Sequence, residues 1–197
     1  MEKRGPWAIL KSETVYENPW MVVTDHAVTR PDGKPGQYGV MSPVNFAIIV
    51  LPVHEDGTIT MVGQYRFATN RYEWELPEGG GPKADTPLHS AKRELKEETG
   101  LSAENWTETF QADLSNSITD EAGYGFIAWN LTQGEAQPEG TEDLSLRRLP
   151  FAEAVARAAK GEFRDMPTVA MLMQTHYMAV SGKLDPVLAK LLLQSET

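Results

Sequence analysis

Short runs with strand character dominate the first part of the chain. Polar and apolar residues alternate around Val15-Tyr16 and from Trp20 to Thr24, whereas Val44 to Val53 is nearly all apolar and rich in Val and Ile. Alternation is typical of a strand at the surface of a sheet, and the apolar run is typical of a buried strand. Asp56-Gly57 separates that run from Thr58 to Val62, and this dipeptide between two strand-like runs predicts a hairpin.

Helical spacing becomes common in the later part of the chain. Thr86 suits the N-cap of a helix over residues 87–99, and Gly100 suits its C-terminal end. Three further helices are predicted at residues 151–160, 169–177 and 187–193, after a strand at residues 124–131. The order of strands, helix, strand and helices predicts an α/β fold with a mixed sheet and helices on its faces. Residues 1–40 are predicted to form a separate small sheet.

Composition places the chain among soluble globular proteins. It has 197 residues, of which 41% are hydrophobic and 23% are charged, and this fits one domain or one domain with a small appendage. No apolar run approaches the ~18–20 residues of a membrane span, and the N-terminus lacks a secretory signal, so we expect a cytoplasmic protein with no membrane partner. The absence of cysteine excludes disulfides, thiol catalysis and thiolate metal sites.

The net charge of −10 narrows the choice of partners. Affinity for long nucleic acids comes mainly from basic clusters that contact phosphates, and the sequence has no such cluster. We therefore expect no nucleic-acid polymer as a partner. A phosphorylated small molecule is compatible with this charge only if cations neutralise it locally, which points to a metal ion.

The helix over residues 87–99 carries a group of acids. Glu94, Glu97 and Glu98 are three and four residues apart, so their side chains lie on neighbouring turns of one face. Such carboxylates suit Mg²⁺, with Mn²⁺ as a substitute, and two ions of this kind can clamp a pyrophosphate. The alternative is a solvated face in which nearby lysine and arginine residues balance the acids. The Gly-rich loop from Glu75 to Pro82 favours the metal interpretation. It brings backbone groups close to the helix start, where an anion such as a phosphate binds readily, so the acids would face a bound phosphate and not only solvent.

The segment from Gly79 to Leu101 resembles the Nudix box. It contains Arg93-Glu94-Leu95-Lys96-Glu97-Glu98-Thr99-Gly100-Leu101, and it departs from the motif only at Asp85, which stands in place of a glutamate. The resemblance implies the Nudix fold, an α/β/α sandwich around a mixed β-sheet, over residues 41–197, with residues 1–40 as a small N-terminal β-sheet extension. It also implies metal ligation by Glu94, Glu97 and Glu98, joined by the backbone carbonyl of Glu78. Arg93 is expected to orient a carboxylate.

Outside the box, the chain is similar to the branch of ADP-ribose and nucleotide-sugar pyrophosphatases. The similarity rests on Gln64-Tyr65-Arg66, Trp74 to Gly79, Ser117 to Glu121 and Glu142-Asp143-Leu144. Members specific for ADP-ribose have a proline shortly after the box, but here the first proline is Pro138. The preference among ADP-ribose, GDP-mannose and UDP-glucose therefore stays open.

Four residues are candidates for substrate binding. Arg66 matches the geometry of a phosphate, with a surface salt bridge as the alternative. Glu121 is a candidate to bind metal or ribose. Trp7 and Tyr16 are candidates to stack on a nucleobase, as are Trp20 and Tyr38, although packing is the commoner role of aromatic side chains.

The catalytic candidates lie in the box and in a late loop. Glu142 is the first choice for the general base, Glu139 is its rival in the polar loop from Gly134 to Asp143, and Glu97 is a third candidate. General-base assistance is worth ~10²–10⁴-fold. A loop that bears glycine and acids can close over a site, although such loops also collect acids without a function.

The resemblance implies a Mg²⁺-dependent pyrophosphohydrolase. It would cleave ADP-ribose or a related nucleoside diphosphate sugar into a nucleoside monophosphate and a sugar phosphate. Two alternatives stay open: a non-catalytic Nudix-like sensor of nucleotide sugars, and a Nudix enzyme acting on dinucleoside polyphosphates or oxidised nucleotides. Members of this branch are typically dimers, so we expect a homodimer to which the aromatic-rich residues 1–40 contribute.

Overall fold

The computed structural model describes residues 2–136 and 143–194, which form two compact units. The first unit comprises Met1–Phe46 and Ala112–Ala122, and the second comprises Ala47–Gln111 and Gly123–Thr197. The domain boundary expected after residue 40 stays a prediction, and the first compact unit extends to Phe46 and includes a later segment. A hydrogen bond of 2.9 Å from the Met41 N–H to the carbonyl oxygen of Ile118 helps to tie that segment to the first unit.

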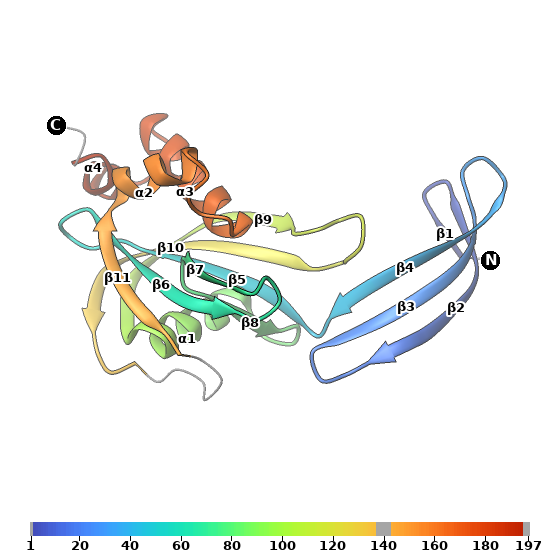
Figure 1. The fold of residues 1–197 in the computed structure, drawn as a ribbon. Coiled ribbons are helices and arrows are strands. Elements are labelled where there is room, and N and C mark those ends of the chain that lie inside the picture. Colours follow the sequence, from blue (N-terminus) through green and yellow to red (C-terminus); the bar gives the residue numbers. More distant parts are fainter. Residues whose placement is uncertain (1, 137–142, 195–197) are drawn as a thin grey trace. The chain divides into compact units, whose positions relative to one another are not determined.

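The first unit is built on an antiparallel sheet. Its strands are β1 (Glu2–Arg4), β2 (Trp7–Glu17), β3 (Met21–Thr29) and β4 (Pro35–Pro43), hydrogen-bonded in that order (Figure 1). Asn18 supports the turn from β2 to β3, because its side-chain oxygen accepts from the backbone N–H groups of Trp20 and Met21, each at 2.9 Å. The separate small sheet expected from the sequence is therefore present.

The second unit contains two sheets. In one, the order is β8 (Glu78–Pro82), β5 (Asn45–Pro52), β10 (Ala122–Gln133) and β9 (Leu101–Asp113), and β10 runs parallel to β5. In the other, β11 (Ser145–Pro150) and β7 (Arg71–Glu75) flank β6 (Thr58–Arg66) in antiparallel pairs. The turn at Asp56-Gly57, where Gly57 has a φ of 75°, leads from β5 to β6 as predicted.

Helices lie on both sides of these sheets. Figure 1 shows α1 (Pro87–Thr99) on one side, and α2 (Phe151–Ala159), α3 (Met166–Val180) and α4 (Pro186–Leu193) on the other. The predicted α/β/α sandwich around a mixed sheet is confirmed. In the described part of the chain, no helix has the length and hydrophobicity needed to cross a membrane.

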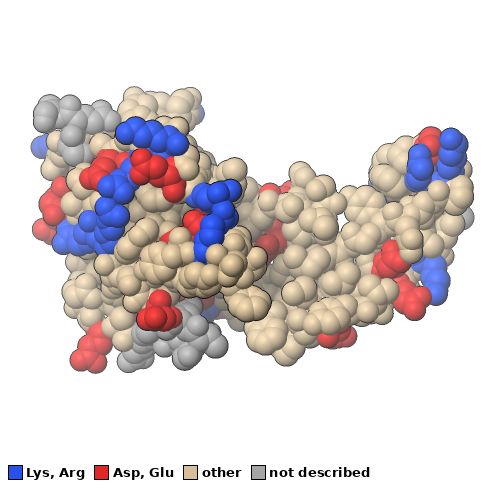
Figure 2. Space-filling view, in the orientation of Figure 1, with Lys and Arg blue, Asp and Glu red and all other residues tan. Residues whose placement is uncertain are grey.

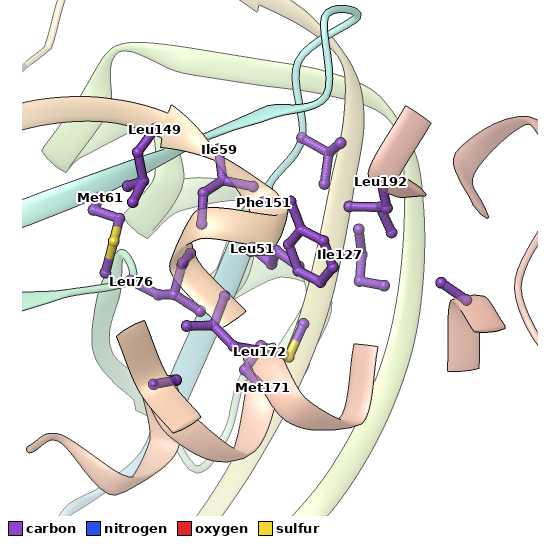
Figure 3. Close-up of a cluster of buried hydrophobic side chains, with 14 of the residues drawn as sticks. Leu51, Ile59, Met61, Leu76, Ile127, Leu149, Phe151, Met171, Leu172 and Leu192 are labelled. Carbon is purple, nitrogen blue, oxygen red and sulfur yellow. The ribbon is translucent and has the colours of Figure 1, made fainter. Parts of the chain in front are cut away.

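The core of the second unit lies under α2, α3 and α4. Leu51, Ile59, Ile127 and Phe151 meet Met171, Leu172 and their neighbours in this cluster (Figure 3). The run from Ile48 to Leu51 is fully buried, which confirms the buried strand predicted from its apolar sequence.

Helix α1 begins and ends where the sequence predicted. The Thr86 hydroxyl accepts from the His89 N–H at 3.3 Å, and Gly100 closes the helix in the left-handed conformation with a φ of 72°. Ala91 and Leu95 face the interior, and Glu94 and Glu98 are buried beside them. The helix thus buries part of its acidic face together with its apolar stripe.

Candidate active site

The acids of α1 differ in their exposure. Glu94 is 8% exposed and Glu98 is 2% exposed, whereas about a third of the Glu97 side chain is exposed, at 32%. Burying a carboxylate is costly unless it is paired or binds a cation. The solvated-face interpretation therefore does not hold for Glu94 and Glu98. Because both carboxylates are buried, positive charge close to them would stabilise their ionised forms.

The loop before α1 lies directly against these carboxylates. The Glu78 N–H donates to Oε2 of Glu98 at 3.1 Å. A methyl group on Gly79 would overlap the carboxyl group of Glu94, so this position accepts only glycine without a shift of its neighbour. The first glycine of the box is therefore a steric requirement for placing Glu94.

Arg93 connects the acids with this loop. Its guanidinium donates to Oε2 of Glu97 at 2.6 Å, to Oε1 of Glu94 at 2.7 Å and to the carbonyl oxygen of Gly80 at 2.9 Å. This geometry agrees with the expected role of Arg93 in orienting carboxylates.

A second group of acids adjoins Glu98. Burial raises the pKa of the Glu78 carboxyl group well above its usual range, and the nearby Asp165 and Glu75 add to the effect while Arg66 opposes it. Thr168 at the start of α3 donates to Oε1 of Glu78 at 3.1 Å. The Glu78 side chain therefore contacts the start of α3, whereas its backbone N–H contacts Glu98 of α1.

Arg66 forms the salt bridge that was the alternative to substrate binding. Its Nε and Nη2 both donate to Oε2 of the buried Glu75, at 2.9 and 2.6 Å. Arg66 also lines a cavity of about 350 Å³, together with Arg71, Arg164 and Met166. The ion pair thus fixes a guanidinium that is still 39% exposed at the edge of a cavity.

The donor set is chemically suited to a hard divalent cation. Glu94 and Glu98 offer buried carboxylate oxygens beside the Glu78 loop, and oxygen donors are the ligands of Mg²⁺ and Mn²⁺. Over residues 2–136 and 143–194, however, no three acidic or histidine side chains already converge as a metal site. Arg93 contacts Oε1 of Glu94 and Oε2 of Glu97, and because a carboxylate has two acceptor oxygens, the arginine and a cation can bind these groups together.

The aromatic candidates lie in the first unit. Trp7 and Tyr38 meet edge to face, with ring centroids 5.4 Å apart, and both line a cavity of about 280 Å³ with His26 and Ile118. Tyr16 is 55% exposed and lines neither of these two cavities, and Trp20 is 74% exposed.

The remaining acids that the sequence singled out lie elsewhere. Glu121 belongs to the first unit, and burial followed by the neighbouring Asp120 raises its pKa. Glu139 and Glu142 lie outside the described residues. Their assignment as catalytic groups stays a prediction.

Sequence reasoning missed Asp165 and Thr168. Asp165 caps α3 by accepting from the Thr168 N–H at 2.7 Å, and a Pro stands in the first turn. This pattern is a signal for a helix start. It marks where α3 begins, but nothing in the sequence indicates that this start meets Glu78.

Comparison with known proteins identifies the family to which the chain belongs. A family model described as NUDIX domain matches residues 41–171, which is more than half of the chain, so the chain belongs to the Nudix family. A second model, described as nucleoside diphosphate sugar hydrolase N-terminal domain, matches residues 7–41. Family members generally need divalent metal ions.

Individual relatives carry the names of nucleotide-sugar pyrophosphatases. An ADP-ribose pyrophosphatase of Mycobacterium tuberculosis is 33% identical over 133 residues, covering 66% of this chain and 64% of the relative, so the chain spans just under two thirds of that protein. A GDP-mannose pyrophosphatase of Yersinia enterocolitica is 31% identical over 150 residues, covering 71% of this chain and 76% of the relative. A crystal structure of an ADP compounds hydrolase shares the fold, with a TM-score of 0.80 and 22% identity over 90% of this chain and 97% of that chain.

Proposed function

We propose that the protein is a metal-dependent pyrophosphohydrolase that cleaves a nucleoside diphosphate sugar into a nucleoside monophosphate and a sugar phosphate. The observation that carries this proposal is the pair of buried carboxylates, Glu94 and Glu98, held against the start of β8 at Glu78 and Gly79. The names of the relatives, ADP-ribose pyrophosphatase and GDP-mannose pyrophosphatase, support the choice of substrate class.

Mg²⁺ is the proposed cation, with Mn²⁺ as a substitute, held by Glu94, Glu97 and Glu98 and by the backbone carbonyl of Glu78. When bound, such a cation neutralises charge on the diphosphate and makes water more acidic. The chain's own contribution is to orient these oxygens, and Arg93 does this through its three hydrogen bonds.

Arg66 is the proposed phosphate contact. Glu75 holds its Nε and Nη2, so the guanidinium is fixed before a substrate arrives and its Nη1 side remains for a phosphate oxygen. The adjoining cavity, with Thr69, Arg164 and Met166 in its lining, is the proposed place for the sugar half of the substrate. Trp7 and Tyr16 stay the proposed aromatic side chains for stacking on a nucleobase, and Trp7 lines a cavity of the first unit with Tyr38.

In the reaction, water adds to one phosphorus and the bridging P–O bond breaks. The proton from water passes to a general base, for which Glu142 is proposed and Glu139 is the rival. The ionised carboxyl group of either residue is a suitable acceptor. Glu121 is proposed to contact substrate or metal.

The assembly proposed is a homodimer formed through residues 1–40. Large apolar side chains are exposed on this part of the chain, with Leu10 at 54%, Val15 at 58% and Trp20 at 74%. These side chains are the proposed contribution of residues 1–40 to the dimer, because apolar surface becomes buried when such an interface forms. Light scattering at micromolar concentration is expected to give the dimer mass, and a monomer mass would contradict this assembly.

A cytoplasmic location, and the absence of membrane and nucleic-acid partners, are part of the same proposal. On the face drawn in Figure 2, acidic and basic side chains are interspersed over the larger unit, and this mixture offers little to a polyanion.

A substrate panel tests the proposal. ADP-ribose, GDP-mannose and UDP-glucose, together with a dinucleoside polyphosphate and an oxidised nucleotide, are incubated with Mg²⁺, with Mn²⁺ or with EDTA. Phosphatase coupling then reports the released monophosphates. We expect turnover of at least one nucleotide sugar, its loss in EDTA and its recovery with Mg²⁺. Binding of a nucleotide sugar without turnover would identify a sensor, and turnover of only the last two compounds would move the protein to another Nudix activity.

A further inference from the structure

The start of α3 is joined to the loop in front of the box. Thr168 is fully buried, and its backbone N–H is committed to the Asp165 cap. Its hydroxyl accepts from the Leu76 N–H at 2.9 Å and donates to Oε1 of Glu78 at 3.1 Å. The Thr168 hydroxyl therefore contacts both ends of the segment from Leu76 to Glu78, although it lies about 90 residues further along the chain.

The same loop is held from its other side. The Glu78 N–H donates to Oε2 of Glu98 at 3.1 Å, and the carbonyl oxygen of Pro77 accepts from the Val50 N–H at 2.9 Å. Pro77 has no N–H of its own. The two N–H groups of the loop, at Leu76 and Glu78, are thus both engaged, one by Thr168 and one by Glu98.

We propose that Thr168 is a positioning residue of the active site: its hydroxyl sets the loop from Leu76 to Glu78 against Glu98 and so fixes the oxygens that meet the metal. Supporting groups of this kind orient metal ligands, and their loss typically costs about 10- to 100-fold in metal affinity or activity. The expected effect of Thr168 on kcat rests on the proposed function. Its effect on metal binding does not depend on the substrate.

The competing explanation is that the hydroxyl only satisfies buried polar groups. Removing it would then lower stability, since an unpaired buried N–H is costly, but would leave metal affinity and kcat of the folded protein unchanged. The two explanations differ in what they predict for metal binding at temperatures where the variant is folded.

The experiment compares Thr168→Val with Thr168→Ser. Valine keeps the shape and removes the hydroxyl, whereas serine keeps the hydroxyl. Mn²⁺ binding to the metal-free protein is measured by electron paramagnetic resonance, and kcat and KM are measured on the best nucleotide sugar with Mg²⁺. We expect Thr168→Val to weaken Mn²⁺ binding about 10-fold or more and to lower kcat more than it changes KM. Thr168→Ser is expected to stay within about threefold of the wild type in both measurements, as rescue by a retained hydroxyl requires.

Thr175 provides a matched control on the same helix. It is also fully buried, and its hydroxyl has no hydrogen-bond partner among the described residues. Thr175→Val removes the same atom from a comparable environment, so Mn²⁺ affinity and kcat are expected to be unchanged.

Wild-type Mn²⁺ affinity in folded Thr168→Val would overturn the inference, whatever its melting temperature. If the valine variant does not fold, Thr168→Ala at 10 °C takes its place with the same expectations and the same contradicting result. A wild-type protein that hydrolyses no nucleotide sugar would remove the proposed function alone, because the comparison of Mn²⁺ binding would still decide the role of Thr168.

Discussion

Replacing Gly79 by alanine tests whether the position of the Glu94 carboxylate matters for turnover. The added methyl group would lie well inside the normal contact distance of about 3.5–4 Å from the Glu94 carboxyl atoms. The backbone of Gly79 is not in the left-handed region, so the penalty is steric and does not come from φ. The carboxylate or the loop must therefore move by roughly 1 Å to restore contact distances.

This displacement sets the expected losses of stability and of kcat. Overpacking at a buried contact costs about 2 kcal/mol. For a chain of this size, that lowers the Tm by about 4–8 °C. A misplacement of about 1 Å in a catalytic group can cost ~10²-fold in rate. We therefore expect Gly79→Ala to remain folded at 25 °C, while its kcat on a nucleotide sugar with Mg²⁺ falls about 100-fold.

The assay pairs steady-state kinetics with thermal unfolding followed by circular dichroism. Gly39→Ala is the matched control, because a methyl group there would meet no atom within 4 Å. Its kcat and Tm are expected to match the wild type. A Gly79→Ala variant with wild-type kcat would refute the reasoning, since it would show that turnover tolerates displacement of Glu94.

Three further predictions concern charge. Glu98→Gln is expected to leave the fold intact and to lower kcat by on the order of 100-fold or more, because a neutral amide replaces a charged metal ligand; near-wild-type kcat would count against the metal site. Burial, and then Arg148, lowers the pKa of His54 below its ordinary 6.5, so the unfolded chain binds more protons as the pH falls below about 6.5. Stability should therefore rise with pH up to about 6.5 and level off above it, and denaturant titrations should show less of this dependence in His54→Gln; an unchanged dependence would contradict the assignment. Glu142→Gln is expected to lower kcat at least about 100-fold, in line with general-base catalysis, whereas Glu139→Gln should not, and the reverse result would exchange their roles.

Local patterns carried enough information to predict the elements that hold the site. The buried strand around Ile48 to Leu51 follows from an uninterrupted apolar run, and the ends of α1 follow from Thr86 and Gly100. These signals depend on neighbouring residues in the chain, so a single sequence contains them. The spacing of Glu94 and Glu98 likewise predicts a shared face, although it does not tell whether that face is buried.

The partners of the site could not be predicted in the same way. Asp165 and Thr168 reach Glu78 because α3 packs over the sheets. Its position there depends on the spatial order of the strands, which a single sequence does not reveal. The Arg66–Glu75 pair joins two strands whose register was not known in advance. Contacts of this kind become visible only when the topology is fixed, whereas their chemistry is evident from the residue types alone.

The charge of the assembled site gives a physical reason for a cation. The acids near the segment before α1 are Glu75, Glu78, Glu94, Glu97, Glu98 and Asp165, and the guanidinium groups near it are those of Arg66 and Arg93, with Arg71 and Arg164 in the lining of the adjoining cavity. Even with Glu78 protonated, as its raised pKa favours, the acids outnumber the bases. Burial makes such an excess costly, and one divalent ion removes two units of it. Arg93 already contacts one oxygen of Glu94 and one oxygen of Glu97, which fixes how both carboxylates point. The arginine therefore arranges carboxylates that carry the excess charge, and a divalent cation supplies the charge that the arginine alone does not balance.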